Sequence, residues 1–260
     1  MHLYRHDIDR NVVADMLKYA EYVVNRGWVC NTLGTVAARV THPKYGYVIY
    51  TKRKGISLEE MGCDDIAITD GTGNLLHGKG TPSIGHQLNR EVLLHRSDIN
   101  AVIHLHVREI IALFTVLGNQ TRLNADAFPL EFCKPSHSSE TFKRLRFISD
   151  DAPLVHRRYI YVLEKEINVE ADASMVKDFV QYTNCFVMPN HGITSFGKDI
   201  SEAYYRLHTA VEEVGRIISA IQVAANLKVL TGKKMKIPYV SEKDVKQMFK
   251  IGRELIYGKK

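Results

Sequence analysis

Cysteine is scarce in this sequence, with four residues among 260, and no two of them have Cys-x-x-Cys spacing. So few thiols, scattered through a chain of this length, exclude a disulfide framework and indicate a reducing, cytoplasmic compartment. Intrinsic disorder and collagen-like structure are also excluded. Hydrophobic residues make up 45% of the chain and charged residues 25%, an ordinary balance for a globular protein.

Long hydrophobic runs are missing as well. Even the longest apolar runs are short, as at 101–103, and they fall far below the ~20 residues that a membrane span needs. The first residues also lack the apolar core of a secretory signal peptide. The net charge of +6 is modest, and no nucleic-acid motif accompanies the basic residues. We therefore expect a small anionic substrate as partner, and neither a membrane nor a nucleic acid.

The spacing of apolar residues predicts alternating helices and short strands. Helical periodicity covers 9–27, 85–96, 107–118, 172–182, 200–226 and 241–257. Strands are predicted at 35–41, 47–51, 66–69, 100–104, 159–163, 185–188 and 193–196, with a hairpin turn at 70–74. No boundary divides the chain, so we expect one domain over 1–260. Its predicted class is α/β, a three-layer α/β/α domain with a central mixed, largely antiparallel sheet.

Twelve histidines are present, and two of them form the most informative motif. His104 and His106 follow a buried apolar run, and residues i and i+2 of a strand point to the same face. Two neutral imidazoles at that spacing suit a divalent transition metal, most readily zinc. The alternative is one buried structural histidine and one at a loop edge. A third ligand is required, and His191 is the candidate, in a tight turn where Gly192 allows a close approach or a positive φ.

The motifs around these histidines resemble the class II aldolase/adducin family, which includes fuculose-phosphate aldolase and ribulose-phosphate 4-epimerase. The resemblance covers roughly 10–118 and 183–222. It is carried by the segments 33–39, 50–55 with 65–70, 81–83 with 96–106, and 190–192 with 201–203. It implies that His104, His106 and His191 hold Zn²⁺ or another divalent transition metal. It also implies a homotetramer with active sites at subunit interfaces.

The resemblance further implies a pocket that binds a substrate phosphate. The matching positions are Gly34, Thr35, Gly55 and Ser83, with Thr51 nearby. Thr35 and Ala37 depart from the Asn and Ser that are usual in the family. Lys52 begins a basic run, 52–54, that is either a solvated hairpin tip or a cationic grip on a phosphate or carboxylate.

The acid/base position is the largest departure. The family carries a Glu or Asp 19 residues before the first ligand of the His-x-His pair, and this chain has Gly85 there. Asn89 replaces the histidine that usually follows four residues later. His86 is the predicted general base, because imidazole titrates in the right pH range; a surface histidine at a helix start is the alternative reading. Glu91 faces elsewhere on the helix and is a poor substitute.

The segment 120–180 is longer than the family's corresponding connection, and it offers candidate groups by residue type alone: His137, Glu140 and His156. The closing helix 241–257 is the other addition. It would reach a neighbouring subunit's site, with Tyr257 as its protic residue, although surface packing is the more ordinary role.

We therefore expect a zinc-dependent lyase that acts on a small phosphorylated or carboxylated hydroxy-carbonyl through a metal-stabilised enediolate or enolate. Two alternatives stay open. One is a non-catalytic, adducin-like assembly or ligand-binding protein. The other is a zinc decarboxylase, dehydratase or epimerase with a different acid/base.

Overall fold

The computed structural model describes residues 8–117, 129–135, 141–164 and 167–255. The chain divides into two compact units. The first comprises 1–107, 167–181 and 193–204, and the second comprises 108–166, 182–192 and 205–260. The single domain over 1–260 stays a prediction.

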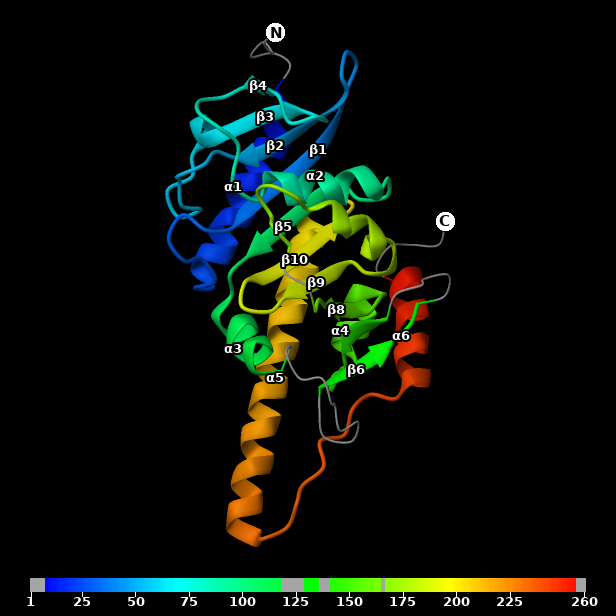
Figure 1. Ribbon diagram of the computed structural model, residues 1–260. Coiled ribbons are helices and arrows are strands. Elements are labelled where there is room, and N and C mark those ends of the chain that lie inside the picture. The colour runs from blue at the N-terminus through cyan, green and yellow to red at the C-terminus, as the bar shows by residue number, and fades with distance from the viewer. Residues whose placement is uncertain (1–7, 118–128, 136–140, 165–166, 256–260) are drawn as a thin grey trace. The chain divides into compact units, whose positions relative to one another are not determined.

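Antiparallel strands form the sheet of the first unit (Figure 1). In spatial order they are β4 (Leu75–His77), β3 (Ile66–Asp70), β2 (Gly46–Lys52), β1 (Thr35–His42), β5 (Ala101–Leu105) and β10 (Gly192–Gly197). The strands predicted here and the hairpin at 70–74 are confirmed. β4 was missed, since three residues are too few to show an alternation of polar and apolar side chains.

Helices lie on both faces of this sheet. The helix α1 (Arg10–Asn25) is capped by Asp9, whose backbone N–H donates to the Tyr50 hydroxyl (2.9 Å). On the opposite face, Arg39 donates to the carbonyl of Leu93 near the end of α2 (His86–His95), at 2.6 Å. Tyr50 pairs with Ala38, the neighbour of Arg39, and successive strand residues point to opposite faces. The predicted α/β/α layering is therefore present in this unit.

The second unit contains a smaller group of strands. Its elements are α3 (Arg108–Leu117), β6 (Leu130–Cys133), β7 (Phe142–Leu145), α4 (Asp151–His156), β8 (Ile160–Val162), β9 (Cys185–Met188) and α6 (Glu242–Leu255). β6, β7 and β8 pair antiparallel, whereas β8 and β9 pair parallel, so the strands are mixed as predicted. α4 packs against α6 at Gly252, where a Cβ atom would overlap the carbonyl of Leu154.

One predicted helix and one predicted helix end differ from the structure. The stretch predicted as a helix at 172–182 forms two short 3₁₀ helices, η3 (Ser174–Asp178) and η4 (Val180–Tyr182). The side chain of Asp172 accepts from the N–H of Ser174 (2.9 Å), and such a local bond favours a turn over a helix. α5 (Ile200–Thr231) runs five residues beyond its predicted end. The last two residues of the helix predicted at 241–257, including Tyr257, lie outside the described residues.

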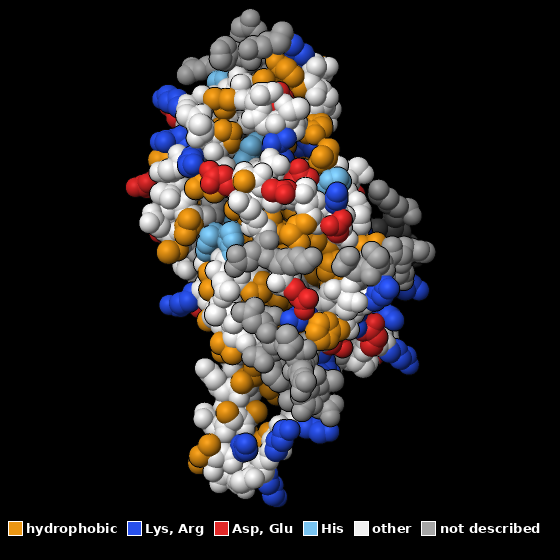
Figure 2. All heavy atoms as spheres, in the orientation of Figure 1, with side chains coloured by type: hydrophobic (Ala, Val, Ile, Leu, Met, Phe, Trp, Pro, Cys, Tyr) orange, Lys and Arg blue, Asp and Glu red, His pale blue; other side chains and the backbone are white. Residues whose placement is uncertain are grey.

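α5 is long and apolar enough to cross a membrane, by length and composition alone. An 18-residue window has a mean hydropathy of 1.2, and 11% of it is buried. No run of this kind was predicted from the sequence. Hydrophobic and basic side chains lie close together over the end of this helix (Figure 2). The large exposed apolar residues in the last third of α5 are Val223, Leu227, Val229 and Leu230. This is weak evidence for a membrane, because helices of soluble proteins pass the same test.

Candidate metal centre

The His-x-His pair lies where the strand β5 ends. His104 is the fourth residue of β5 and His106 follows its last residue, so both side chains are on one face. Thr35 of β1 pairs with His104, which places the imidazoles on the face that α2 covers. The buried apolar run and its two-residue period thus put both rings side by side, as predicted.

His191 is brought to the same place by strand pairing. It is the second residue before Ile193, and Ile193 pairs with Leu105 of β5. The turn is closed by the N–H of His191, which donates to the carbonyl of Met188 (3.1 Å). The turn has its positive φ, 63°, at Asn190 and not at Gly192, for which a positive φ was one of two predicted roles. Asparagine tolerates this conformation because its short side chain bonds locally.

The three histidines form a cluster whose potential ligand atoms all lie within 4.8 Å of one another. His104 Nε2 and His106 Nε2 are 3.1 Å apart. On the other side of its ring, His104 Nδ1 meets the hydroxyl of Thr194 (2.9 Å) on the paired strand β10. A threonine that holds Nδ1 fixes the ring orientation and leaves Nε2 for a ligand, as in metal sites generally. The donor set of three ring nitrogens fits Zn²⁺ or a similar ion.

Gly34 sits directly beside this strand end. A Cβ atom on Gly34 would lie 2.9 Å from Leu105 Cδ2 and 3.2 Å from the His104 carbonyl oxygen, and its φ is +85°. Both the space and the backbone conformation therefore require glycine. Gly34 lets the start of β1 approach the end of β5 closely.

Two predicted anion-binding hydroxyls lie on the same face as His104. Thr35 and Thr51 are both buried, and their Oγ1 atoms are 3.4 Å apart. Ala37 pairs with Thr51 and with Val102 of β5, so this part of the face is lined by small side chains. The structure thus brings Thr35, Thr51 and His104 together on one face.

Ser83 and Gly55 lie at the loops beyond β2. The N–H of Ser83 donates to the Lys52 carbonyl (2.8 Å), which leaves the Ser83 hydroxyl as its free donor among the described residues. Gly55 has a φ of +82° and open space beside it. These positions agree with the pocket that the resemblance implied, although their role as anion ligands stays a prediction.

Lys52 is not at a solvated tip. It is 1% exposed, and its Nζ donates to the carbonyls of Thr32 (2.6 Å) and Ile56 (2.5 Å). Because Thr51 faces α2, its neighbour Lys52 points to the opposite face. Burial lowers the pKa of the ammonium to about 8. Lys52 therefore ties together the two loops that carry Gly34 and Gly55.

The other two residues of the basic run are paired with acids. Arg53 Nε donates to Asp65 Oδ1 (2.6 Å), and Lys54 Nζ donates to Glu170 Oε1 (3.1 Å). Only Lys54 is largely in solvent, with 48% of its side chain exposed. The basic run 52–54 thus consists of a buried lysine that joins two loops and two basic residues in ion pairs.

Gly85 is the N-cap residue of α2, and its position faces the sheet. A Cβ atom there would lie 3.2 Å from Thr35 Cγ2, and Thr35 pairs with His104. A side chain at position 85 would therefore point toward the face that carries His104. This is the place of the carboxylate that the family carries, and glycine supplies no group that moves a proton.

His86 points elsewhere. Its Nε2 meets the hydroxyl of Thr69 on β3 (3.0 Å), and β3 lies three strand spacings from β5, about 14 Å. Its Nδ1 is buried without a hydrogen-bond partner. Burial, assisted by the charge of Arg90, lowers the pKa of His86 to about 4. As a general base it stays a prediction, and that role requires the ring to leave Thr69 or Nδ1 to accept the proton.

Two polar residues near the site were not assigned roles from the sequence. The contact of Thr194 with His104 depends on the register between β5 and β10, and no local sequence pattern predicts that register. Asn89 is 0% exposed, and neither its Oδ1 nor its Nδ2 has a hydrogen-bond partner among the described residues. It lies one helical turn after Gly85, so its amide is on the same face of α2.

Two of the remaining acid/base candidates lie in the described part of the chain, and neither belongs to the histidine cluster. Glu91 meets His95 Nε2 (3.4 Å). His156 is fully buried in the second unit, where desolvation lowers its pKa to about 3. His137 and Glu140 lie outside the described residues.

The fold and the histidine cluster agree with the class of protein that the motifs resemble. The sequence profile described as the Class II Aldolase and Adducin N-terminal domain matches residues 14–217, and the chain belongs to this family. The resemblance noted from its motifs is thereby confirmed, as is the predicted fold class.

Named relatives support an aldolase-type lyase. An L-fuculose phosphate aldolase from Methanococcus maripaludis is 26% identical over 205 residues, which is 79% of this chain and 94% of the relative. A methylthioribulose-1-phosphate dehydratase from Pseudomonas fluorescens is 23% identical over 70% of this chain and 80% of its own length. An aldolase II superfamily protein from Pseudomonas syringae shares the fold, with a TM-score of 0.68 at 16% identity, covering 98% of this chain and 88% of that one.

Proposed function

We propose that this protein is a zinc-dependent lyase that acts on a small hydroxy-carbonyl substrate carrying a phosphate or carboxylate. The cluster of His104, His106 and His191, on the face that also carries Thr35 and Thr51, is the observation that supports it. The aldolase and dehydratase among the relatives are both named for phosphorylated substrates of this kind.

The histidines would hold the ion, and Thr194 keeps His104 in the orientation that presents Nε2. When bound, the ion supplies a Lewis acid for the carbonyl or hydroxyl oxygens of the substrate, and so favours cleavage through an enediolate or enolate. The chain's own contribution is to fix three neutral nitrogen donors on paired strands, which keeps the positive charge of the ion uncompensated. Such a site prefers an anionic or enolate-forming substrate.

The anionic end of the substrate would be held by loops beside this cluster. The hydroxyls of Thr35, Thr51 and Ser83 are the donors, with the backbone at Gly34 and Gly55 allowing close approach. Lys52 would support this anion site indirectly, from the opposite face of the sheet. Its ammonium donates to the carbonyls of Thr32 and Ile56 and so fixes the spacing of the two loops.

The glycine at position 85 bears on which reaction follows. A reaction that abstracts a proton from carbon needs a base, and a positioned base contributes about 10²–10⁴ in rate. Decarboxylation of a 3-oxo acid needs none in its first step, since loss of carbon dioxide itself generates the enolate. Gly85 also favours the second candidate, a non-catalytic adducin-like protein, although a scaffold does not require three clustered imidazoles.

We also propose a cytoplasmic homotetramer with its sites at subunit interfaces, as the family resemblance implied. The few scattered cysteines support the compartment. Light scattering of the purified protein tests the assembly, and a monomer at micromolar concentration would contradict it.

A substrate test separates the candidates. Protein stripped with a chelator and reloaded with Zn²⁺ is mixed with L-fuculose 1-phosphate, methylthioribulose 1-phosphate and 3-oxo acids, and products are identified by mass spectrometry. Turnover that requires the metal supports the lyase. A metal-loaded protein that binds these compounds without turning any of them over supports the scaffold. Purified wild-type protein that binds no metal overturns the proposal.

A further inference from the structure

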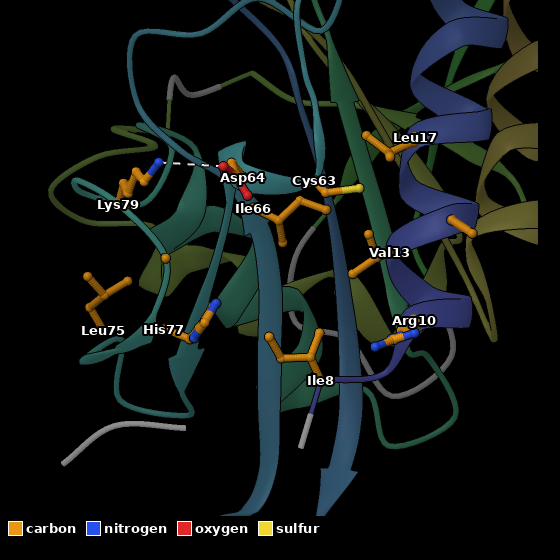
Figure 3. Close-up of a pocket in the computed structure, with 12 residues that line it drawn as sticks. Ile8, Arg10, Val13, Leu17, Cys63, Asp64, Ile66, Leu75, His77 and Lys79 are labelled. Carbon is orange, nitrogen blue, oxygen red and sulfur yellow. Dashed lines mark hydrogen bonds and ion pairs between the residues drawn. The ribbon is translucent and has the colours of Figure 1, made fainter. Parts of the chain in front are cut away.

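A cavity of about 810 Å³ lies in the first unit, on the face of the sheet opposite the histidines. α1 forms one wall, and β3 with the turn before it and β4 with the residues after it form the other (Figure 3). Ile66 lines it, while the next residue, Ala67, pairs with Thr51 on the histidine face. Since β3 is also three strand spacings from β5, this cavity is separate from the metal centre.

The inner wall of this cavity is apolar. α1 contributes side chains at the helical spacing i, i+1 and i+4, which form one stripe of the helix. Ile66 of β3 is 3% exposed and closes the wall behind them. The apolar lining residues are Ile8, Val13, Ala14, Leu17, Ile66 and Leu75. The volume and this lining are those of a site for a small organic molecule.

The rim of the cavity is cationic. Arg10 and His77 line it from opposite walls, and no hydrogen bond or ion pair occupies either side chain among the described residues. Lys79 is 3.5 Å from Asp64 in an exposed pair, so these two charges offset each other. Among the residues that the structure describes, the Arg10 guanidinium is therefore the principal charge of the rim. Guanidinium groups match carboxylate, sulfonate and phosphate in geometry.

The cationic rim is held in place by a glycine. Gly78 stands between His77 and Lys79 with a φ of +103°. A Cβ atom there would lie 2.6 Å from the carbonyl oxygen of Ile66, so no other residue permits β4 to lie this close to β3. The positions of His77 and Lys79 at the rim therefore depend on glycine at position 78.

We propose that this cavity binds a small amphipathic anion, with an apolar body against α1 and Ile66 and one acidic group at Arg10. The site is independent of the metal centre and of the proposed reaction. Its ligand is a molecule whose apolar part alone binds weakly and whose acidic group supplies the specificity, because a hydrogen bond to a charged group is stronger than a neutral one.

A matched pair of fluorescent probes tests the charge requirement. 8-Anilinonaphthalene-1-sulfonate and N-phenyl-1-naphthylamine share one aromatic body, and only the first carries a sulfonate. Titrated into metal-loaded protein, the sulfonate is expected to bind about tenfold more tightly than the neutral probe. Arg10→Gln should abolish this difference, whereas Lys18→Gln, on the same helix but outside the lining, should preserve it. Equal affinities in the wild type, or an unchanged ratio in Arg10→Gln, overturn the proposal.

Two further measurements place the bound probe. Ala14→Phe fills the cavity from an exposed helix position and should weaken both probes at least tenfold, while circular dichroism confirms that the variant is folded. The free thiol of Cys63 lines the cavity, and the equally exposed thiol of Cys30 does not. The sulfonate should slow alkylation of Cys63 by N-ethylmaleimide and leave Cys30 unaffected. Equal protection of both, or of neither, contradicts binding in this cavity.

Discussion

The end of β5 and the start of α2 meet on one face of the sheet, and they differ in the functional side chains that they carry. At the strand end, three imidazoles converge and Thr194 supports one of them. At the helix start, Gly85 offers no side chain, Asn89 is buried without a partner, and His86 bonds to Thr69. The proposed metal-holding half of the site, at the strand end, and the proposed proton-moving half, at the helix start, are therefore formed by separate groups of residues. The first identifies the class of chemistry, and the second determines the reaction.

The largest expected effect is at the metal-holding half. His104→Ala should reduce zinc content from about one per chain to none, because two imidazoles with no other protein ligand hold the ion poorly. His42→Ala is the control and should retain the metal. Metal analysis after dialysis measures both. If His104→Ala retains its zinc, the histidine cluster is not the set of metal ligands, and the proposed difference between the two halves of the site is wrong.

Gly85→Glu tests the proton-moving half. The new side chain starts 3.2 Å from Thr35 Cγ2, on the histidine face. If only the base is missing for aldol cleavage, the rate on a ketose phosphate should rise by about 10²–10⁴. Ile84→Glu, at an exposed neighbouring position, should not raise it. A variant that binds zinc normally but shows no gain would mean that the native chemistry departs from aldol cleavage beyond this one position.

Thr194→Val removes the hydroxyl at His104 Nδ1 and keeps the shape of the side chain. Groups that orient a metal ligand contribute about 10–100-fold to affinity. Zinc affinity, measured by competition with a chromophoric chelator, should fall by that factor. The comparison Ser195→Ala, whose hydroxyl bonds the Ala203 carbonyl instead, should leave affinity unchanged. Equal losses in both variants would indicate general destabilisation.

Lys52→Met tests the clamp between the two loops. Losing both bonds to Thr32 and Ile56 should weaken the binding of inorganic phosphate about tenfold by calorimetry. Lys54→Met removes the same charge from an exposed pair and should change affinity less than twofold. If Lys54→Met has the larger effect, the anion is held by the surface charge and not by the loop geometry.

His86 produces a dependence of stability on pH. Its pKa is about 4 when folded and about 6.5 when unfolded, so between these values the unfolded chain binds more protons. The free energy of unfolding therefore falls as pH drops from 6.5 toward 4, by up to about 1.4 kcal/mol per pH unit. Above pH 6.5 the contribution is constant. Urea unfolding of His86→Gln should show a shallower fall, and an identical slope would mean that the ring is not buried as described.

Local patterns predicted the parts of the site that depend on period and residue type. The period-two spacing of His104 and His106 after an apolar run gave both the strand and the shared face. The resemblance predicted that the loops with Gly34 and Gly55 form an anion pocket, but it did not predict the contacts between these loops. Lys52 was interpreted either as part of a solvated hairpin tip or as a grip on an anion. The direction of its side chain follows from strand register alone, because Thr51 pairs with Ala37 on the histidine face and Lys52 points to the opposite face. Thr194 likewise acquires its meaning through the register between β5 and β10, which joins residues far apart in sequence. The missing carboxylate at Gly85 was predicted from the resemblance, and packing adds only that this position faces Thr35.

X-ray absorption at the metal edge of the purified protein tests the central claim most directly. We expect zinc, or another divalent transition metal, bound by three imidazole nitrogens, at about 2.0–2.1 Å for zinc. That imidazole scattering should be lost in a His104→Ala/His106→Ala variant. A protein without metal, or a metal whose coordination shell contains sulfur or no imidazole, would contradict it.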